Sequence, residues 1–251
     1  MHPTAVVASE IELGLDVEIG PFAVIGPGVR LGDGSRVMAH AFVEGPSTFG
    51  ARTVVHPFAA VGGAPQDVKH KGEPTRLVVG EGNTFREYVS VHRGTVGGGG
   101  ETRIGDGCLF MAYVHVAHDC TVGSNVIMAN ASTLAGHVRV GSYVVFGGLA
   151  GVAQFVRIGE GAMIAAGAMV ENDVPPFVVA AGDRARVRGL NRVGLKRRGV
   201  DPESIAALRA AHRHLFRSSA PLAESLRTLD PALTTHREVA TLVAFLNAKT
   251  A

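Results

Sequence analysis

The chain has 251 residues, which suits one moderate domain or one domain with a small appendage. Its formal net charge of +2 gives no sign of general binding to nucleic acid or to an anionic membrane surface. The sequence contains no run of about 18 apolar residues, so no transmembrane segment is predicted. Residues 1–10 lack the features of a secretory signal. The two cysteines, Cys108 and Cys120, make no disulfide framework and fit a reducing compartment, so we expect a cytoplasmic protein.

A hydrophobic repeat with a period of six residues covers most of the chain. Its large apolar positions begin at Val7, return after two interruptions at Val79 and Ile104, and end at Val170. The residue two positions earlier is usually small or valine, and glycine often follows, as a tight turn requires. Three short strands of about six residues make a triangular coil of about 18 residues. The repeat therefore predicts a parallel β-helix over residues 1–174, with the large side chains filling its shaft.

The two interruptions predict loops that leave the coil, at about residues 62–76 and 92–102. A solenoid tolerates such loops at its corners, and loops on one face often carry function. The first contains Gln66, Asp67 and Lys69, which are typical of an ordinary polar loop tip as well as of a binding site.

Residues 175–251 predict a connecting segment and a C-terminal helical cap. Asp201-Pro202-Glu203 reads as an N-cap, a proline at the first helical position and an acidic first turn. Further helices are expected to begin near Pro221 and Thr235. Basic residues precede the first helix, and they fit either a solvated face or a site for phosphates and an acidic partner. They are Arg184, Arg186, Arg188, Arg192, Lys196, Arg197 and Arg198.

Four histidines cluster around the second interruption: His92, His115, His118 and His137. A coil of about 18 residues places His118, Gly136 and Gln154 in one column. An exposed imidazole can act as a general base near neutral pH, and a nearby backbone N–H can stabilise an oxyanion. Asp119 is a candidate to orient the imidazole. The same residues also fit a solvated polar face without catalysis, and no P-loop, zinc-finger spacing or nucleophile elbow is present.

Several longer stretches are more specific than the repeat itself. They are Gln66-Asp67, Gly72-Glu73-Pro74-Thr75-Arg76, His92-Arg93-Gly94-Thr95, His115-Val116-Ala117-His118-Asp119-Cys120-Thr121-Val122-Gly123, Leu134-Ala135-Gly136-His137 and Gly194-Leu195-Lys196-Arg197-Arg198-Gly199. Because of these stretches, the chain resembles the UDP-N-acetylglucosamine 3-O-acyltransferases that begin lipid A synthesis. The resemblance covers essentially the whole length of the chain.

The resemblance implies a left-handed parallel β-helix of hexapeptide repeats with a small C-terminal α-helical domain. It implies a homotrimer with active sites between adjacent subunits, and no metal or other cofactor. The implied donor is an (R)-3-hydroxyacyl group on acyl carrier protein, and the implied acceptor is UDP-N-acetylglucosamine or its 3-amino analogue. By the same resemblance His118 is the general base, Asp119 orients it, and Gly136 supplies the oxyanion-hole amide.

The resemblance also implies substrate-binding roles for a wider set of residues, with Asp67 and Lys69 acting from the neighbouring subunit. The set is Gln66, Asp67, Lys69, His115, His137, Gln154, Asn191, Arg197 and Arg198. Ala166 is implied to influence acyl-chain length. Two positions depart from the family pattern: Ala153 stands where a histidine is usual, and Val193 where a glutamate is expected. These changes leave open whether the acceptor carries a 3-hydroxyl or a 3-amino group.

Three other functions deserve comparison. The sister N-acyltransferase carries an additional N-terminal uridine-binding domain, whereas here the repeat begins by Val7. A β-helical carbonic anhydrase uses three histidines around zinc, which the histidine cluster invites but does not require. A structural β-helix such as an ice-binding protein would show flat threonine ladders, and no such ladder appears in the sequence.

Overall fold

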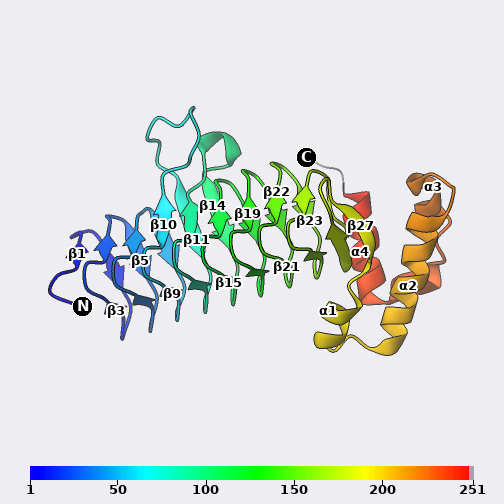
Figure 1. Cartoon of the computed structure of the whole chain (residues 1–251), viewed down its shortest axis with the longest axis horizontal. Coiled ribbons are helices and arrows are strands. Elements are labelled where there is room, and N and C mark those ends of the chain that lie inside the picture. Colours follow the sequence, from blue (N-terminus) through cyan, green and yellow to red (C-terminus); the bar gives the residue numbers. More distant parts are fainter. Residues whose placement is uncertain (249–251) are drawn as a thin grey trace.

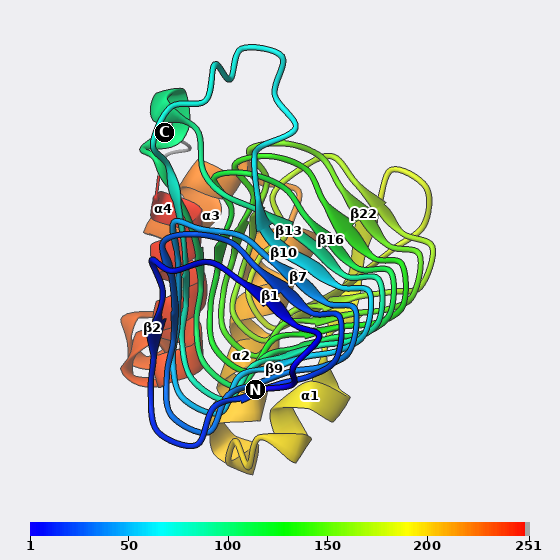
Figure 2. The ribbon, with the colours of Figure 1, turned by 90° about the vertical axis from the view of Figure 1, so that its left-hand side faces the viewer.

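The computed structural model describes residues 1–248, which form a long triangular prism with helices at one end (Figure 1). Viewed along the prism, successive coils superpose as triangles (Figure 2). The coils pair in parallel, strand on strand, and build three long sheets. The predicted parallel β-helix is therefore present.

Each sheet is one face of the prism. Sheet 1 contains β1 (Val6–Val7), β4 (Val24–Ile25), β7 (Phe42–Val43), β10 (Ala60–Gly63), β13 (Ser90–His92), β16 (His115–Val116), β19 (Thr133–Leu134), β22 (Gly151–Val152) and β25 (Met169–Val170). Sheet 2 contains β2 (Glu12–Leu13), β5 (Val29–Leu31), β8 (Ser47–Phe49), β11 (Arg76–Val79), β14 (Glu101–Ile104), β17 (Thr121–Val122), β20 (Arg139–Val140) and β23 (Arg157–Ile158). Sheet 3 contains β3 (Glu18–Ile19), β6 (Arg36–Val37), β9 (Val54–Val55), β12 (Thr84–Phe85), β15 (Leu109–Phe110), β18 (Ile127–Met128), β21 (Val145–Phe146), β24 (Met163–Ile164), β26 (Val178–Ala181) and β27 (Arg186–Leu190).

Three columns of turns join these sheets, and we name each corner by the sheets it connects. The 1–2 corner includes residues 117–120, 135–138 and 153–156; the 2–3 corner includes 123–126, 141–144 and 159–162; the 3–1 corner includes 129–132, 147–150 and 165–168. Up to β25 the pairing register is 18 residues wherever no loop intervenes, as between His115 and Thr133, and it shortens to 16 residues between β24 and β26.

Both loops arise at the 1–2 corner. One lies between β10 and β11, and the other lies between β13 and β14 and contains the short 3₁₀ helix η1 (Val96–Gly98). The register absorbs them without disturbing the shaft, because Val61 pairs with Val91 and Val91 with Val116. The first loop rises from one corner in Figures 1 and 2. The loops and the turn after β16 thus occupy three consecutive coils of the same corner.

The repeat's large apolar side chains fill the shaft. Phe85 and Phe110 stack with their ring centroids 5.0 Å apart, which is close to the spacing of strands in a sheet. Phe49, Phe146 and Met128 are also fully buried. Cys108 and Cys120 are buried free thiols. Burial of so continuous an apolar column is the main source of the prism's stability.

A hairpin and four helices follow the coil. Strands β26 and β27 pair antiparallel, and β26 extends sheet 3 by pairing in parallel with β24. We expected only a connecting segment there, because β27 exposes three residues in succession and lacks the alternation that indicates a strand. The helices are α1 (Arg192–Arg197), α2 (Pro202–Arg217), α3 (Leu222–Arg227) and α4 (Arg237–Asn247), with the 3₁₀ helix η2 (Pro231–Thr235) before the last. Asp201 caps α2 as expected, since its side chain accepts a hydrogen bond from the Ser204 N–H.

The described residues form two separate apolar cores, one in the shaft and one among the helices. Leu195, Leu208 and Leu242 lie in the second core, which Phe177 joins to the end of the coil. Arg157 ties α4 to the prism by pairing with Asp173 and lying over the Phe245 ring. None of the helices within residues 1–248 is long and apolar enough to cross a membrane.

Candidate active site

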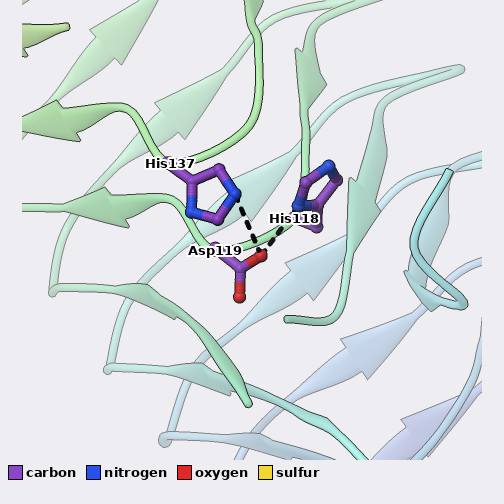
Figure 3. A group of neighbouring side chains, drawn as sticks. All are labelled: His118, Asp119 and His137. Carbon is purple, nitrogen blue, oxygen red and sulfur yellow. Dashed lines mark hydrogen bonds and ion pairs between the residues drawn. The ribbon is translucent and has the colours of Figure 1, made fainter. Parts of the chain in front are cut away.

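The turn after β16 carries an interacting histidine and aspartate. Nδ1 of His118 lies 2.7 Å from Oδ2 of Asp119 (Figure 3). A carboxylate only accepts hydrogen bonds, so Nδ1 is the protonated nitrogen and Nε2 carries the lone pair. Within residues 1–248 no group hydrogen-bonds to Nε2, and the ring is 16% exposed. His118 therefore has the protonation pattern and the access that a general base requires.

Asp119 is fully enclosed, and two residues that the sequence analysis did not single out hold it there. Its Oδ1 accepts a hydrogen bond from the Thr95 N–H, and its Oδ2 accepts one from the Thr95 hydroxyl, both at 2.7 Å. Its own N–H donates to the Thr102 hydroxyl at 2.8 Å. Thr95 belongs to the second loop, and the only sequence signal for it was its place in the stretch that starts at His92. A contact such as that between Thr95 and Asp119, which joins coils of different length, leaves no periodic pattern in the sequence.

Left-handed backbone conformations turn three side chains out of this corner. Asp119, His137 and Phe155 have φ values of 61°, 64° and 66° and occupy equivalent positions in successive coils. His137 stacks on Phe155 and meets His118 edge to face, with Nε2 3.7 Å from Oδ2 of Asp119. His137 thus has a second, longer contact with the same carboxylate oxygen.

The ligand atoms of His118, Asp119 and His137 are close enough together to hold a metal ion. However, the Nδ1 that faces the carboxylate is an N–H donor, and Oδ2 already accepts from Thr95 as well. These contacts satisfy one another without a cation. The arrangement fits an oriented acid–base pair better than an open set of metal ligands.

Gly136 lies one coil from His118, as the column arithmetic predicts. A Cβ at this position would come within 2.7 Å of Cε1 of His118, so only glycine leaves the imidazole its present place. The backbone N–H of Gly136 has no acceptor within residues 1–248. An unpaired amide beside a base is the geometry that stabilises a developing oxyanion.

His115 and His92 continue the histidine cluster toward the first loop. Nδ1 of His115 hydrogen-bonds to the Ser90 hydroxyl at 2.7 Å, and the two imidazoles meet edge to face. Burial, followed by the nearby His115, lowers the pKa of His92 to about 4. Burial also lowers the pKa of His115, with His118 adding to the effect. Both rings are therefore neutral near pH 7, and they do not add positive charge beside the base.

A groove of about 570 Å³ runs along sheet 1 from His115 to the β26–β27 turn. Thr133, Gly151 and Met169 form its floor, and Glu171 and Arg184 pair at its far end. Ala153 also lines it with a small apolar side chain. The groove is mainly apolar and starts beside His115, which suits a flexible hydrocarbon chain.

The remaining predicted residues are not gathered around His118. Gln66, Asp67 and Lys69 lie in the first loop, where the Lys69 N–H donates to Oδ1 of Asp67 at 2.9 Å. Gln154 is exposed in the column of His118, and Ala166 is exposed at the 3–1 corner, in the coil of Met169.

The predicted nucleotide-binding residues belong to the 2–3 corner instead. Asn191 caps α1 by accepting from the Gly194 N–H, and its amide donates to the Gly161 carbonyl. Arg198 pairs with Glu160 and lies over the Tyr143 ring. The Asn191 amide is thus engaged within the chain, whereas Nη1 of Arg198 is buried without a hydrogen-bond partner within residues 1–248, and Arg197 is exposed. The whole of sheet 2 separates this corner from His118.

Comparison with known proteins gives consistent matches along the chain. A family model described as UDP-N-acetylglucosamine O-acyltransferase, domain 2, matches residues 173–251, and the bacterial transferase hexapeptide model matches residues 101–136. The chain is 46% identical over 248 residues to the acyl-[acyl-carrier-protein]–UDP-N-acetylglucosamine O-acyltransferase of Thermodesulfovibrio yellowstonii, which covers 99% of this chain and 96% of that protein.

Solved structures agree over the full length. The UDP-N-acetylglucosamine O-acyltransferase of Moraxella catarrhalis superposes with a TM-score of 0.96 at 35% identity and covers 100% of this chain and 98% of its own. The UDP-N-acetylglucosamine acyltransferase of Campylobacter jejuni superposes with a TM-score of 0.92 at 38% identity, covering 100% and 97%. The predicted fold class, a left-handed β-helix with a small helical C-terminal part, is therefore confirmed.

The lowered pKa of His92 predicts a specific pH dependence of stability. The unfolded chain binds a proton at this residue below about pH 6.5, whereas the folded chain resists it down to about pH 4. The contribution of neutral His92 to the free energy of unfolding is thus complete above pH 6.5 and is lost as the pH falls toward 4. Chemical denaturation of His92→Asn across this window should show a shallower acid-side decline than the parent. The same substitution at exposed His2 serves as the control, and equal slopes for parent and His92→Asn would contradict the prediction.

Proposed function

The chain belongs to the UDP-N-acetylglucosamine O-acyltransferase family, and we propose that it moves an (R)-3-hydroxyacyl group from acyl carrier protein to the 3-position of UDP-N-acetylglucosamine, or of its 3-amino analogue, in lipid A biosynthesis. The observation that carries the proposal is the oriented His118–Asp119 pair beside the Gly136 amide, which has no acceptor within residues 1–248. The free thiols of Cys108 and Cys120 support the expected cytoplasmic location.

The chemistry follows from the positions of three groups. Nε2 of His118 takes the proton from the acceptor's hydroxyl or amine as that atom forms its bond to the thioester carbonyl carbon. The carbonyl oxygen becomes negative and accepts a hydrogen bond from the Gly136 N–H. When the tetrahedral species collapses, the carbon–sulfur bond breaks and the departing sulfur receives the proton from His118. Asp119 keeps the imidazole oriented and stabilises it while it is charged.

No covalent acyl-enzyme is needed for this reaction, because a thiol leaves readily and the base only has to activate the acceptor. His118 therefore acts twice, first as base and then as acid. The apolar groove beside His115 is the proposed place for the acyl chain during both steps.

A second subunit is needed to complete the proposed site. His118 lies at the 1–2 corner, whereas Asn191, Arg197 and Arg198 belong to the 2–3 corner of the same chain. We propose a homotrimer in which the 1–2 corner of one subunit meets the 2–3 corner of the next. The first loop, with Asp67 and Lys69, projects from the prism and is then free to reach an adjacent subunit (Figure 2).

The distribution of exposed apolar side chains supports this arrangement. Phe22, His40, Phe58, Tyr88 and Tyr113 stack in an exposed ladder along the 3–1 corner. Sheets 1 and 3, on either side of it, expose Val6, Phe42, Ile127 and Met169. Sheet 2 instead presents charged residues such as Arg30, which pairs with Glu12. A trimer with the 3–1 corner nearest its axis would cover the two apolar faces and leave sheet 2 in solvent.

A basic groove on the helical cap fits the proposed protein donor. The groove, about 280 Å³, has an apolar floor of Leu190, Ile205 and Ala210 and arginines along its rim. These arginines are Arg192, Arg209 and Arg213. They make no ion pair within residues 1–248, and their charge complements an acidic carrier protein. We assign this groove to docking of acyl carrier protein.

Replacing the base tests the reaction most simply. His118→Ala should lower turnover by about 100-fold or more, because the acceptor's proton is no longer removed. Transfer should be measured with UDP-N-acetylglucosamine and its 3-amino analogue, since the preference between them identifies the acceptor. His214→Ala in the helical cap is the control, and size-exclusion chromatography checks the assembly. Near-normal turnover of an intact His118→Ala assembly would exclude the proposed mechanism.

Charge reversal in the basic groove tests donor docking. Arg209→Glu with Arg213→Glu should raise the KM for the acylated carrier protein about tenfold, and added salt should shrink the difference. The KM for the sugar nucleotide should stay the same, because that substrate binds elsewhere. Arg139→Glu, an exposed change on sheet 2, is the matched control. An unchanged KM for the acylated carrier protein in the double variant would exclude this groove as the docking site.

Acyl-chain length is expected to depend on Ala166. It lies in the same coil as Met169, which lines the far end of the groove, about 13 Å along the shaft from His118 at strand spacing. Ala166→Met should therefore shorten the preferred chain in an assay with donors of graded length. Ala112→Met alters the same column three coils earlier and should not change the preference. An identical chain-length profile for Ala166→Met and the parent would reject the role.

A further inference from the structure

We propose that Thr95 and Gly98, two residues of the second loop, fix the orientation of the Asp119 carboxylate and are positioning residues for the transfer reaction. The inference rests on the proposed role of His118 as the base. It assigns a function to the second loop, which acts on the base through Asp119.

Thr95 contacts both oxygens of the carboxylate. Its N–H donates to Oδ1 and its hydroxyl donates to Oδ2, each at 2.7 Å. Two donors from one residue fix the plane of the carboxylate as well as its position. The hydroxyl is itself fixed, because its oxygen accepts a hydrogen bond from the Gly98 N–H at 3.1 Å. Oδ2 therefore has one defined direction left in which to meet a histidine.

Gly98 also limits the position of the Asp119 carboxylate, because its backbone packs against that group. A Cβ on Gly98 would come within 2.0 Å of Cγ of Asp119, so the loop backbone lies directly against the carboxylate. No side chain fits there without moving the carboxylate. Neighbouring Gly97 has nothing within 4 Å of the corresponding position, and neither glycine has a left-handed φ. The requirement for glycine at 98 is thus one of contact with Asp119 and not of backbone conformation.

Hydrogen bonds to other parts of the chain fix the start of the second loop in place. Arg93 is buried, and its guanidinium donates to the carbonyls of Gly45 and Gly62 at 2.7 and 2.6 Å. The Gly100 N–H donates to the Thr95 carbonyl at 2.7 Å, which closes the loop on itself. The segment is therefore tied to the two preceding coils before it reaches Asp119.

The fixed orientation decides which of two histidines receives the carboxylate. Oδ2 lies 2.7 Å from Nδ1 of His118 and 3.7 Å from Nε2 of His137, and Figure 3 shows the aspartate between the two rings. Rotation of a free carboxylate would favour His137 as readily as His118. The titratable groups around the pair are His137, His115 and His92, and none supplies a competing anion. Thr95 keeps Oδ2 on His118, and so keeps the base in its reactive tautomer.

The matched glycines give the direct test. In the enzyme as it assembles in solution, Gly98→Ala should lower kcat about tenfold or more with little change in either KM, because only the orientation of the base is disturbed. Gly97→Ala should keep the parent's kcat. Equal kcat values for Gly98→Ala and Gly97→Ala would overturn the proposal, since the added methyl would then have no effect on Asp119.

The hydroxyl is tested separately, so that a folding defect is recognised. Thr95→Val should reproduce the loss of kcat and Thr95→Ser should restore it, because serine keeps both donors. Thr53→Val removes another buried hydroxyl, one that bonds the Gly50 carbonyl, and should lower stability without lowering kcat. Failure of serine to rescue, or an equal kcat loss in Thr53→Val, would overturn the positioning role.

Measuring His118→Ala in the same series separates this inference from the proposed function. An inactive His118→Ala with a normal Gly98→Ala would reject the positioning role and keep the base. An active His118→Ala would reject both.

Discussion

Parallel pairing at an offset of 18 residues, which joins the coils of His118, Gly136 and Gln154, is the constraint on which the site depends. It places Gly136 one strand spacing from His118, so close that a Cβ at Gly136 would meet the imidazole. It also puts Asp119, His137 and Phe155 in one column at the corner. A slip of one residue would turn these side chains into the shaft or onto another face. The geometry of the proposed site therefore depends first on the register and only then on any single side chain.

The loops show how a regular coil acquires an irregular site. Both interrupt the same corner in the two coils that precede His118, and the shaft continues beneath them in register. The second loop reaches back over Asp119 and satisfies both of its oxygens. A buried carboxylate needs such donors, because without them its burial would cost several kcal/mol. The loop therefore stabilises the charge that orients the base, and the proposed positioning role follows from that requirement.

Much of this could be predicted from the sequence, because the information was periodic. The six-residue repeat gave the shaft, the corners and the column of His118 and Gly136, and the interruptions gave the loops. Thr95 was not found, because its contact with Asp119 joins segments 24 residues apart across a loop of irregular length. The β26–β27 hairpin was also missed, since β27 exposes Arg186, Val187 and Arg188 in succession and so shows no alternation of buried and exposed residues. Nor could the repeat show that Asn191 and Arg198 use their polar groups at a different corner from His118.

The central proposal is that each active site is built from two subunits. It is tested by mixing two variants that are each inactive alone, His118→Ala and Arg197→Glu, and allowing the trimers to form from both. If the 1–2 corner of one subunit works with the 2–3 corner of the next, random mixing should restore about a quarter of the parent's activity, because that share of interfaces pairs two intact halves. If both halves of each site come from the same chain, every site in the mixture carries a lesion and no activity returns.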